Sequence, residues 1–473
     1  MNSQFRTFAK DASFAVMSQL ISLLSGLVLS FILPKYISVA NYGYWQLFVL
    51  YTGYVGFLHF GFNDGLYLKL GGKTFESLNK KELNSSMCIM LIQQVLLSSV
   101  LLGAILFFEN NPIKRTMFII LAFYVVVENL YKTMSFVLMA TGRVNFYSRT
   151  VIYEKSLLLL SILLLIIYKP QVNVGYYMSA FAFAHFVVLL VTTTQFRGFV
   201  IDGLKNLNRG LSLYLDSTKV GFVLLFSNLC STFIVGSGRF VIEKYWNIEM
   251  FARVSLALTL SAFLLFFVSQ ISYVLFPYIR RVRDENQAVI LERSTFVLTV
   301  CAVILFAMFF PLYYVTKHWL PQYSGTLPFL IILAPLSFYD IKTNLIYNTF
   351  FKNLNRVKPL FTINFLTLCL ALLIYLTSAQ LGNIYTLVGG MLFAVVFKSV
   401  IMQYYLFKHY SLKVDKASYM EFLITIILML SYVLFGMSAL MISYVLLLLV
   451  FLMFNKRKIM LTVKFMQSIK KEY

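Results

Sequence analysis

The chain has 473 residues, of which 60% are hydrophobic and only 12% are charged. Soluble proteins carry charge on about a quarter of their residues, so this composition excludes an ordinary soluble protein. The net charge of +22 is distributed over short segments between apolar runs, which excludes a separate basic domain for nucleic acid.

The apolar residues occur in runs of about twenty, the length that an α-helix needs to cross a bilayer core of about 30 Å. We therefore predict an all-α polytopic membrane protein with about 14 transmembrane helices. In chain order the predicted spans are 12–33, 44–64, 87–108, 116–138, 150–168, 174–194, 219–241, 251–275, 295–316, 328–347, 359–380, 383–405, 420–437 and 439–455.

Lysine and arginine residues lie mainly in alternate loops. Of the 40 such residues, 28 lie in the segments that this alternation places on the side of the two termini, and 8 lie in the opposite loops. Cytoplasmic loops of membrane proteins carry an excess of positive charge. We therefore expect both termini to be cytoplasmic.

The first two spans recur later in the chain. A shift of 209 residues places Lys35 on Lys244 and Tyr36 on Tyr245 without a gap. Many transporters consist of repeated helix groups around a site at the centre of the membrane. We therefore expect two pseudo-symmetric six-helix lobes plus a C-terminal helix pair.

The expected domains follow from this repeat. The N-terminal lobe covers residues 1–198 and the C-terminal lobe covers 219–405. The C-terminal helix pair and a basic cytoplasmic tail cover 406–473. Residues 199–218, in which apolar side chains alternate with Arg209 and other cations, suit an amphipathic cytoplasmic linker at the membrane surface.

Charged residues within spans are candidates for the functional site, because inserting one costs about 3 kcal/mol. Glu128 and Lys132 are four residues apart and share one helix face. They either neutralise each other and fix helix packing, or they line a cavity where Glu128 couples transport to an ion or a proton. Glu154 and Lys155 form a second candidate pair.

A polar stripe occupies the span 328–347. Asp340 lies near its middle, Lys342 follows, and Asn344 shares the helix face of Asp340 one turn later. The stripe either packs against other helices or lines water, with Asp340 as a site for an ion or a proton.

Three more cations are candidates for binding an anionic ligand. Lys398 either faces a cavity or extends its long side chain to the cytoplasmic surface. Arg239 follows Gly236-Ser237-Gly238, where glycine permits a close approach or a helix break, and a guanidinium suits phosphate. Arg143 lies at the inner mouth, as a site residue or simply as a cytoplasmic loop cation.

Motifs of enzymes and of nucleotide-driven transport are absent from the sequence. The four histidines are widely separated, and the four cysteines lie in apolar runs without a CxxC motif. We therefore predict no enzyme activity, no cofactor and no metal site.

The run Phe31-Ile32-Leu33-Pro34-Lys35-Tyr36, followed by Tyr42-Gly43 and Phe60-Gly61-Phe62, resembles the N-terminal signature of bacterial O-antigen and capsular polysaccharide repeat-unit flippases. These proteins belong to the multidrug/oligosaccharidyl-lipid/polysaccharide exporter superfamily. The segment His318-Trp319-Leu320-Pro321-Gln322-Tyr323 is similar to an outer-loop motif of the same family.

The resemblance implies a flippase of the bacterial inner (plasma) membrane. Its substrate would be an undecaprenyl-diphosphate-linked oligosaccharide, moved from the cytoplasmic to the outer leaflet by alternating access, and polymerase and chain-length proteins of the same pathway would be its partners. Members of the family have cationic cavities. The span 12–33 lacks the arginines of some relatives, so the diphosphate contacts would come from Lys132, Arg143, Arg239, Lys342 or Lys398.

Two alternatives remain open. A cation-coupled multidrug exporter of the same superfamily would favour an anionic cavity, whereas the charges within these spans are mixed. An O-antigen polymerase or ligase would need a long outer loop with catalytic arginine or histidine, whereas the predicted outer loops are short.

Overall fold

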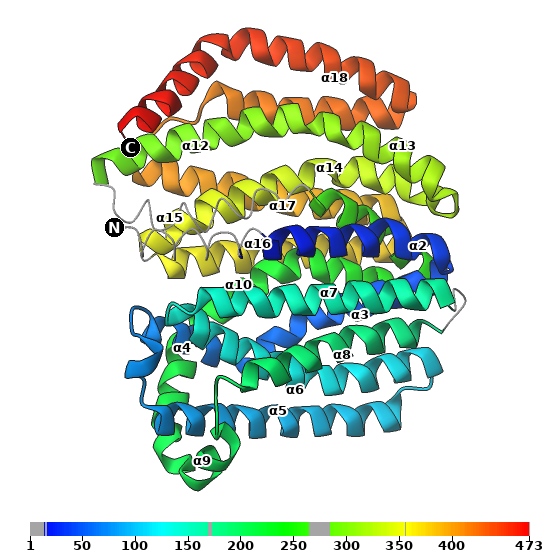
Figure 1. Cartoon of the computed structure of the whole chain (residues 1–473). Helices are drawn as coiled ribbons and strands as arrows, with labels where there is room; N and C mark the ends of the chain where they lie inside the picture. Colours follow the sequence, from blue (N-terminus) through cyan, green and yellow to red (C-terminus); the bar gives the residue numbers. More distant parts are fainter. Residues whose placement is uncertain (1–13, 15–16, 169–172, 264–283, 355, 473) are drawn as a thin grey trace. The chain divides into compact units, whose positions relative to one another are not determined.

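The computed structural model describes residue 14 and residues 17–168, 173–263, 284–354 and 356–472. All regular secondary structure in these ranges is helical (Figure 1). Eleven helices of the described ranges are long and apolar enough to cross a membrane, judged by length and composition. The prediction of an all-α, multi-pass membrane protein is confirmed.

These eleven helices correspond to the predicted spans other than 44–64 and 251–275. The last of them lies in α18 (Lys416–Glu472), which contains both predicted C-terminal spans. The boundary between the two spans lies beside Gly436, where a φ of 80° interrupts the helix. Such a φ is accessible mainly to glycine. The predicted span 251–275 is described as a helix only to residue 263, and its remainder and the start of span 12–33 lie outside the described residues.

The chain divides into two compact units, Met1–Leu229 and Cys230–Tyr473, and the boundary falls within one long helix, α10. The helices of the N-terminal unit after the segment 17–27 are η1 (Val28–Ile32), α2 (Leu33–Tyr36), α3 (Val39–Val55), η2 (Gly56–His59), α4 (Phe62–Leu70), η3 (Phe75–Ser77), α5 (Lys80–Phe108), α6 (Pro112–Ala140), α7 (Val144–Tyr168), α8 (Val174–Thr193), α9 (Phe199–Lys205) and the first part of α10 (Leu207–Tyr245).

The C-terminal unit begins with the second part of α10 and a helix at residues 248–263. Its further helices are α12 (Asp284–Leu305), η4 (Phe306–Met308), α13 (Phe309–Trp319), η5 (Pro321–Thr326), α14 (Leu327–Ile341), η6 (Lys342–Tyr347), α15 (Asn348–Asn353), α16 (Val357–Gln380), α17 (Ile384–His409) and α18.

Short polar residues determine where several helices begin. Asn79, Asn111, Asn173 and Asn383 each accept a backbone N–H bond in the first turn of the following helix. An asparagine at this position satisfies a donor that the helix itself leaves unpaired.

The repeat that the sequence indicates includes such helix starts. Ser38 Oγ accepts the N–H of Asn41 at 3.2 Å, and Asn247 Oδ1 accepts the N–H of Met250 at 2.8 Å. These caps are 209 residues apart, as are Tyr36 and Tyr245, the last residues of α2 and α10. The two halves therefore begin with the same helix–cap–helix arrangement.

The predicted continuous span 44–64 is wrong in one respect. The helix α3 ends at Val55, and after η2 the backbone reverses at Phe60 (φ 51°) and Gly61 (φ 93°) before α4 begins. Glycine tolerates this conformation and phenylalanine does not favour it. The chain therefore crosses this region as two shorter helices.

The helix α4 lies unusually close to the first part of α10. A Cβ atom at Gly65 would be 1.8 Å from the carbonyl oxygen of Ser217, and one at Gly221 would be 1.9 Å from that of Gly61. Only glycine permits two helices to pack at this distance, where van der Waals contacts hold membrane helices together. Residues 199–218 accordingly form α9 and the first turns of α10.

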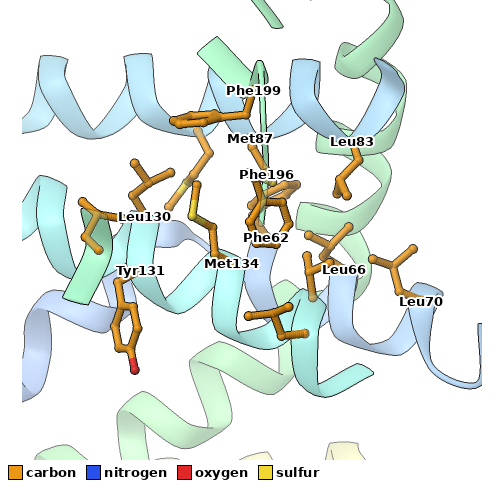
Figure 2. Packing of buried hydrophobic residues seen from close by; sticks show 14 of the residues in the cluster. Phe62, Leu66, Leu70, Leu83, Met87, Leu130, Tyr131, Met134, Phe196 and Phe199 are labelled. Carbon is orange, nitrogen blue, oxygen red and sulfur yellow. The ribbon is translucent and has the colours of Figure 1, made fainter. Parts of the chain in front are cut away.

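Figure 2 shows the apolar core of the N-terminal unit. Side chains from α4, α5, α6, α8 and α9 meet there, including Phe62 of α4, Met87 of α5, Met134 of α6 and Phe199 of α9. The hydroxyl of Tyr131 points away from this cluster and lies 3.1 Å from Thr150 Oγ1 of α7. The core thus fixes α6, which carries Glu128 and Lys132.

The C-terminal unit has its own core, centred on Tyr347, Phe350, Phe351 and Met402. The helix α14 contains Pro335 and continues into the π-helical segment η6, which begins at Lys342. Proline removes a backbone hydrogen bond, and π-helical turns are frequent at functional sites.

Candidate functional site

The predicted pair Glu128 and Lys132 is present on α6. The Lys132 ammonium lies 3.0 Å from Glu128 Oε1, and the Glu128 side chain is buried, whereas that of Lys132 is 37% exposed. Lys132 Nζ also lies so close to Gly56 of η2 that a Cβ there would be 2.6 Å away. The pair neutralises itself and occupies the space beside the break after α3.

His185 and the predicted pair Glu154 and Lys155 complete this cluster, which the sequence alone did not connect. His185 Nε2 of α8 lies 3.3 Å from Glu154 Oε1 of α7 and 3.7 Å from Glu128 Oε2. The Lys155 ammonium lies 2.5 Å from Glu154 Oε1. Two carboxylates, two lysines and one histidine therefore share one buried region of the N-terminal unit.

Uncharged polar side chains donate hydrogen bonds to the backbone carbonyls at the helix break next to this cluster. Asn129 Nδ2 donates to the Val55 carbonyl at 3.0 Å and to Gln94 Oε1 at 2.9 Å. Gln94 Nε2 in turn donates to the Leu58 carbonyl at 2.9 Å. Carbonyls freed by a helix break within a membrane need such partners. The adjacent Gln93 and Gln94 in an apolar run were the sequence signal for this role.

The C-terminal unit holds a different kind of site around Lys398 of α17. Its ammonium donates to Ser231 Oγ of α10 at 2.7 Å, and its side chain is 2% exposed. Asp340 of α14 interacts with it electrostatically and also hydrogen-bonds Asn344. In the described ranges Lys398 forms no ion pair shorter than 4.0 Å. Lys398 is thus a buried cation and does not extend to the surface.

The stripe predicted after Asp340 is present and partly accessible. Asn344 is exposed, and its Oδ1 accepts a hydrogen bond from Asn348 Nδ2 at 3.0 Å. Lys342 lies on another face of the same element. Asp340, Asn344 and Lys398 are therefore brought together, and Lys342 belongs to a separate site.

Lys342 pairs with Glu421, a residue of α18 that sequence analysis did not single out. Lys342 Nζ hydrogen-bonds Glu421 Oε2 and donates to Thr299 Oγ1 of α12 at 2.6 Å. The side chains of Lys342 and Glu421 are both buried. A lone carboxylate at the start of an apolar span was the available signal, because it needs a partner there.

Arg239 lies near the C-terminal end of α10. Its Nε donates to Ser255 Oγ at 3.2 Å, and its guanidinium carbon lies 5.3 Å from the Phe251 ring centre. The helix is not broken at Gly238. A Cβ there would lie 2.5 Å from Met391 Cε of α17, so this glycine permits close packing.

Arg143 follows the end of α6 and contacts three partners. Its Nη2 lies 2.6 Å from Glu76 Oε1, its Nη1 donates to Gln195 Oε1 at 2.8 Å, and its guanidinium carbon lies 4.0 Å above the Phe75 ring. The hydrogen bond from Arg143 holds the pKa of the Glu76 carboxyl below its usual value. Arg143 therefore links the loop before α5 to the end of α8.

In the described part of the chain, no group of three or more histidine, cysteine, aspartate or glutamate side chains could hold a metal ion. The cluster at His185 is instead a set of ion pairs, and Lys398 and Arg239 are cations held by hydroxyl groups. The latter arrangement suits an anion, since a hydroxyl leaves the positive charge of its partner intact.

Comparison with solved structures identifies the fold. The chain is similar to the lipid II flippase MurJ in an inward closed conformation, with a TM-score of 0.66 and 13% sequence identity over 94% of this chain and 99% of that one. This protein has the fold of the MurJ and MATE transporters.

Two MATE structures support this fold assignment. An inward-facing multidrug resistance MATE family transporter of the MOP superfamily has a TM-score of 0.57 and 14% identity over 84% of this chain and 96% of that one. A MATE in complex with MaD3S has a TM-score of 0.54 and 12% identity over 84% and 94%. No protein-family model matches the sequence, and no curated protein sequence matches it.

Proposed function

We propose that this protein is a flippase for undecaprenyl-diphosphate-linked oligosaccharide repeat units, which it moves from the cytoplasmic to the outer leaflet of the bacterial inner membrane by alternating access. The observation that carries the proposal is the similarity to the lipid II flippase, which spans 94% of this chain. The signature of polysaccharide exporters at residues 31–36 favours an oligosaccharide-linked lipid.

Charge at the C-terminal unit supports an anionic headgroup as the ligand. Lys398 donates to the Ser231 hydroxyl and Arg239 to the Ser255 hydroxyl, and a diphosphate could replace either hydroxyl as the acceptor. We propose these two residues as the diphosphate contacts. Asp340, next to Lys398, is our candidate for coupling to an ion or a proton.

Three of the predicted cations form ion pairs with carboxylates. Lys132 pairs with Glu128, Lys342 with Glu421 and Arg143 with Glu76. Transferring any of them to a phosphate would leave its carboxylate without a partner. We propose that these three cations hold helices together and that the headgroup binds elsewhere.

A drug exporter of the MATE type is the second candidate, because those structures share the fold. The MATE similarity covers 84% of this chain against 94% for the flippase, and its TM-score is lower. Both values favour the flippase.

A deletion strain separates the two candidates. We expect the deletion to accumulate lipid-linked repeat units at the cytoplasmic face and to lose surface polysaccharide, and the intact gene to restore both. Wild-type polysaccharide together with new sensitivity to cationic drugs would support the exporter and contradict the flippase.

A further inference from the structure

Asn344 is an exposed polar side chain in a deeply buried span. The helical segment Pro321–Asn353 has the largest buried share among the eleven candidate membrane spans of the described ranges. Within residues 341–347 the other six residues are buried, and Asn344 is exposed. An amide with unused hydrogen-bonding groups is costly in hydrocarbon, because lipid tails supply no partners. The side of the helix that carries Asn344 therefore meets water or a polar ligand.

Two neighbours on the same helix hold the Asn344 amide in one orientation. Its Oδ1 accepts a hydrogen bond from Asn348 Nδ2 at 3.0 Å. Its Nδ2 donates to the Asp340 carboxylate, since an ionised carboxylate can only accept. An amide has two N–H donors and two acceptor lone pairs, and the described residues use one of each on Asn344. The side chain therefore presents a further donor and a further acceptor side by side.

Two other exposed polar side chains within spans bond to their own helix. Ser99 Oγ of α5 donates to the Val95 carbonyl at 2.8 Å, and Thr377 Oγ1 of α16 donates to the Leu373 carbonyl at 2.9 Å. Hydroxyl groups can satisfy themselves in this way on a surface that faces lipid. Asn344 bonds to side chains and keeps unused groups, so self-satisfaction does not explain its exposure.

The Asn344 amide is next to the cation that we propose as a diphosphate contact. Asp340, its hydrogen-bond partner, interacts electrostatically with the buried Lys398 of α17, whose ammonium donates to Ser231 Oγ at 2.7 Å. Lys398, Asp340 and Asn344 therefore form one polar row within the C-terminal unit. A ligand that places a phosphate at Lys398 brings the group attached to that phosphate near Asn344.

The charges of this polar row favour one class of group at Asn344. A metal cation would be repelled by the ammonium of Lys398, and a second anion would be repelled by the carboxylate of Asp340. A sugar hydroxyl is uncharged and both donates and accepts a hydrogen bond. It therefore matches the one donor and the one acceptor that Asn344 presents.

We propose that Asn344 binds a hydroxyl group of the sugar attached to the diphosphate, and that it thereby selects glycosylated over sugar-free polyprenyl diphosphate. This inference rests on the proposed function, because it takes Lys398 as the diphosphate contact. Asp340 and Asn348 orient the amide for this bond. Asn344 is then the residue by which the protein distinguishes a lipid carrier that holds a sugar from one that does not.

Binding of two lipids to the purified full-length protein tests this role. The probes are undecaprenyl diphosphate and undecaprenyl diphosphate linked to one N-acetylglucosamine, and native mass spectrometry measures the bound lipid. We expect the parent to bind the glycosylated lipid about tenfold more tightly, the value of one or two hydrogen bonds. We expect Asn344→Leu to bind both lipids with the affinity of the parent for undecaprenyl diphosphate. A preference retained in Asn344→Leu would overturn the inference.

Two further variants separate the inference from the function on which it rests. Lys398→Gln should weaken the binding of both lipids by a common factor, because it removes the diphosphate contact and keeps the sugar contact. Thr377→Ala removes an exposed hydroxyl that bonds to its own helix, so it should bind both lipids as the parent does. A parent that binds neither lipid would overturn the proposed function together with the inference. A parent that binds both lipids with equal affinity would overturn the inference alone.

Asn344→Ala keeps the test available if the leucine side chain disturbs folding. Substitutions of exposed side chains usually leave stability almost unchanged, so we expect this variant to melt at the temperature of the parent. It should lose the preference for the glycosylated lipid as Asn344→Leu does. A folded Asn344→Ala that still prefers the glycosylated lipid would overturn the inference.

Discussion

The buried charged residues of the two units have different kinds of partner. In the N-terminal unit, Glu128 and Glu154 each bind a lysine and both face His185, so the cluster is closed on itself. In the C-terminal unit, Lys342 forms an ion pair with Glu421, whereas Lys398 donates to the hydroxyl of Ser231.

This difference separates charges that hold helices together from charges that can bind a ligand. A cation bonded to a carboxylate has its partner in place, and breaking that pair is costly. A cation bonded to a hydroxyl keeps most of its charge for an incoming anion. We therefore propose two roles for the same residue type, a lysine within a span.

The largest expected effect on stability is at the ion pair of Lys342 and Glu421 in the C-terminal unit. Glu421→Ala leaves the Lys342 ammonium buried without a carboxylate, and we expect a loss of about 3–5 kcal/mol of stability. The measurement is thermal unfolding of the purified protein in detergent. The double variant Glu421→Ala with Lys342→Met should recover most of this loss, and a stable single variant would contradict the assignment of a closed pair.

Helix packing provides the next comparison between the units. We expect Gly65→Ala to cost about 1–3 kcal/mol, because the new Cβ would meet the Ser217 carbonyl at 1.8 Å in a rigid backbone. In Gly238→Ala the nearest atom is the flexible end of Met391, so the cost should be smaller. Melting temperatures rank the two variants.

Gly103→Ala is the control for these packing variants. A Cβ at Gly103 meets nothing within 4 Å, and alanine is the better helix former, so stability should rise slightly. If Gly238→Ala were as harmful as Gly65→Ala, the proposed contrast in packing would be wrong.

Removal of a hydroxyl-bonded cation should change transport more than stability. We expect Arg239→Gln to lower export of polysaccharide by about tenfold, the value of one charge-assisted hydrogen bond. Surface polysaccharide at equal membrane levels is the readout. Lys244→Gln, an exposed cation on the same helix, should have no effect, and equal export by both variants would exclude Arg239 from the site.

The smallest effect is expected at the exposed pair Glu76 and Arg143. Arg143 lowers the pKa of the Glu76 carboxyl, so the stabilisation is present at neutral pH and disappears as pH falls through this lowered pKa. Hydrogen exchange at Phe75 and its neighbours should increase there in the parent. Glu76→Gln should show the faster exchange already at pH 7, and a parent without acid sensitivity would refute the contact.

The sequence was sufficient to predict features that depend on residues close together in the chain. The pair Glu128 and Lys132 follows from the four-residue helical spacing, and the predicted boundary between the last two spans lies beside Gly436. The spans themselves follow from the length of apolar runs, because a helix must cross a fixed thickness.

Contacts between distant segments could not be read from the sequence. Glu421 is 79 residues from Lys342, and His185 is 31 residues from Glu154, so no spacing rule connects them. The reversal at Phe60 was equally hidden, since phenylalanine rarely adopts a positive φ and Gly61 alone does not distinguish a break from close packing.

The central claim is that this protein moves a diphosphate-linked lipid with the help of Lys398. The most direct measurement is the appearance of a fluorescent polyprenyl-diphosphate-linked oligosaccharide in the outer leaflet of proteoliposomes. The account predicts translocation by the parent and by Lys408→Gln, an exposed cation at the end of α17, and a loss of at least about tenfold in Lys398→Gln. Translocation by Lys398→Gln at the parental rate, or none by the parent, would contradict it.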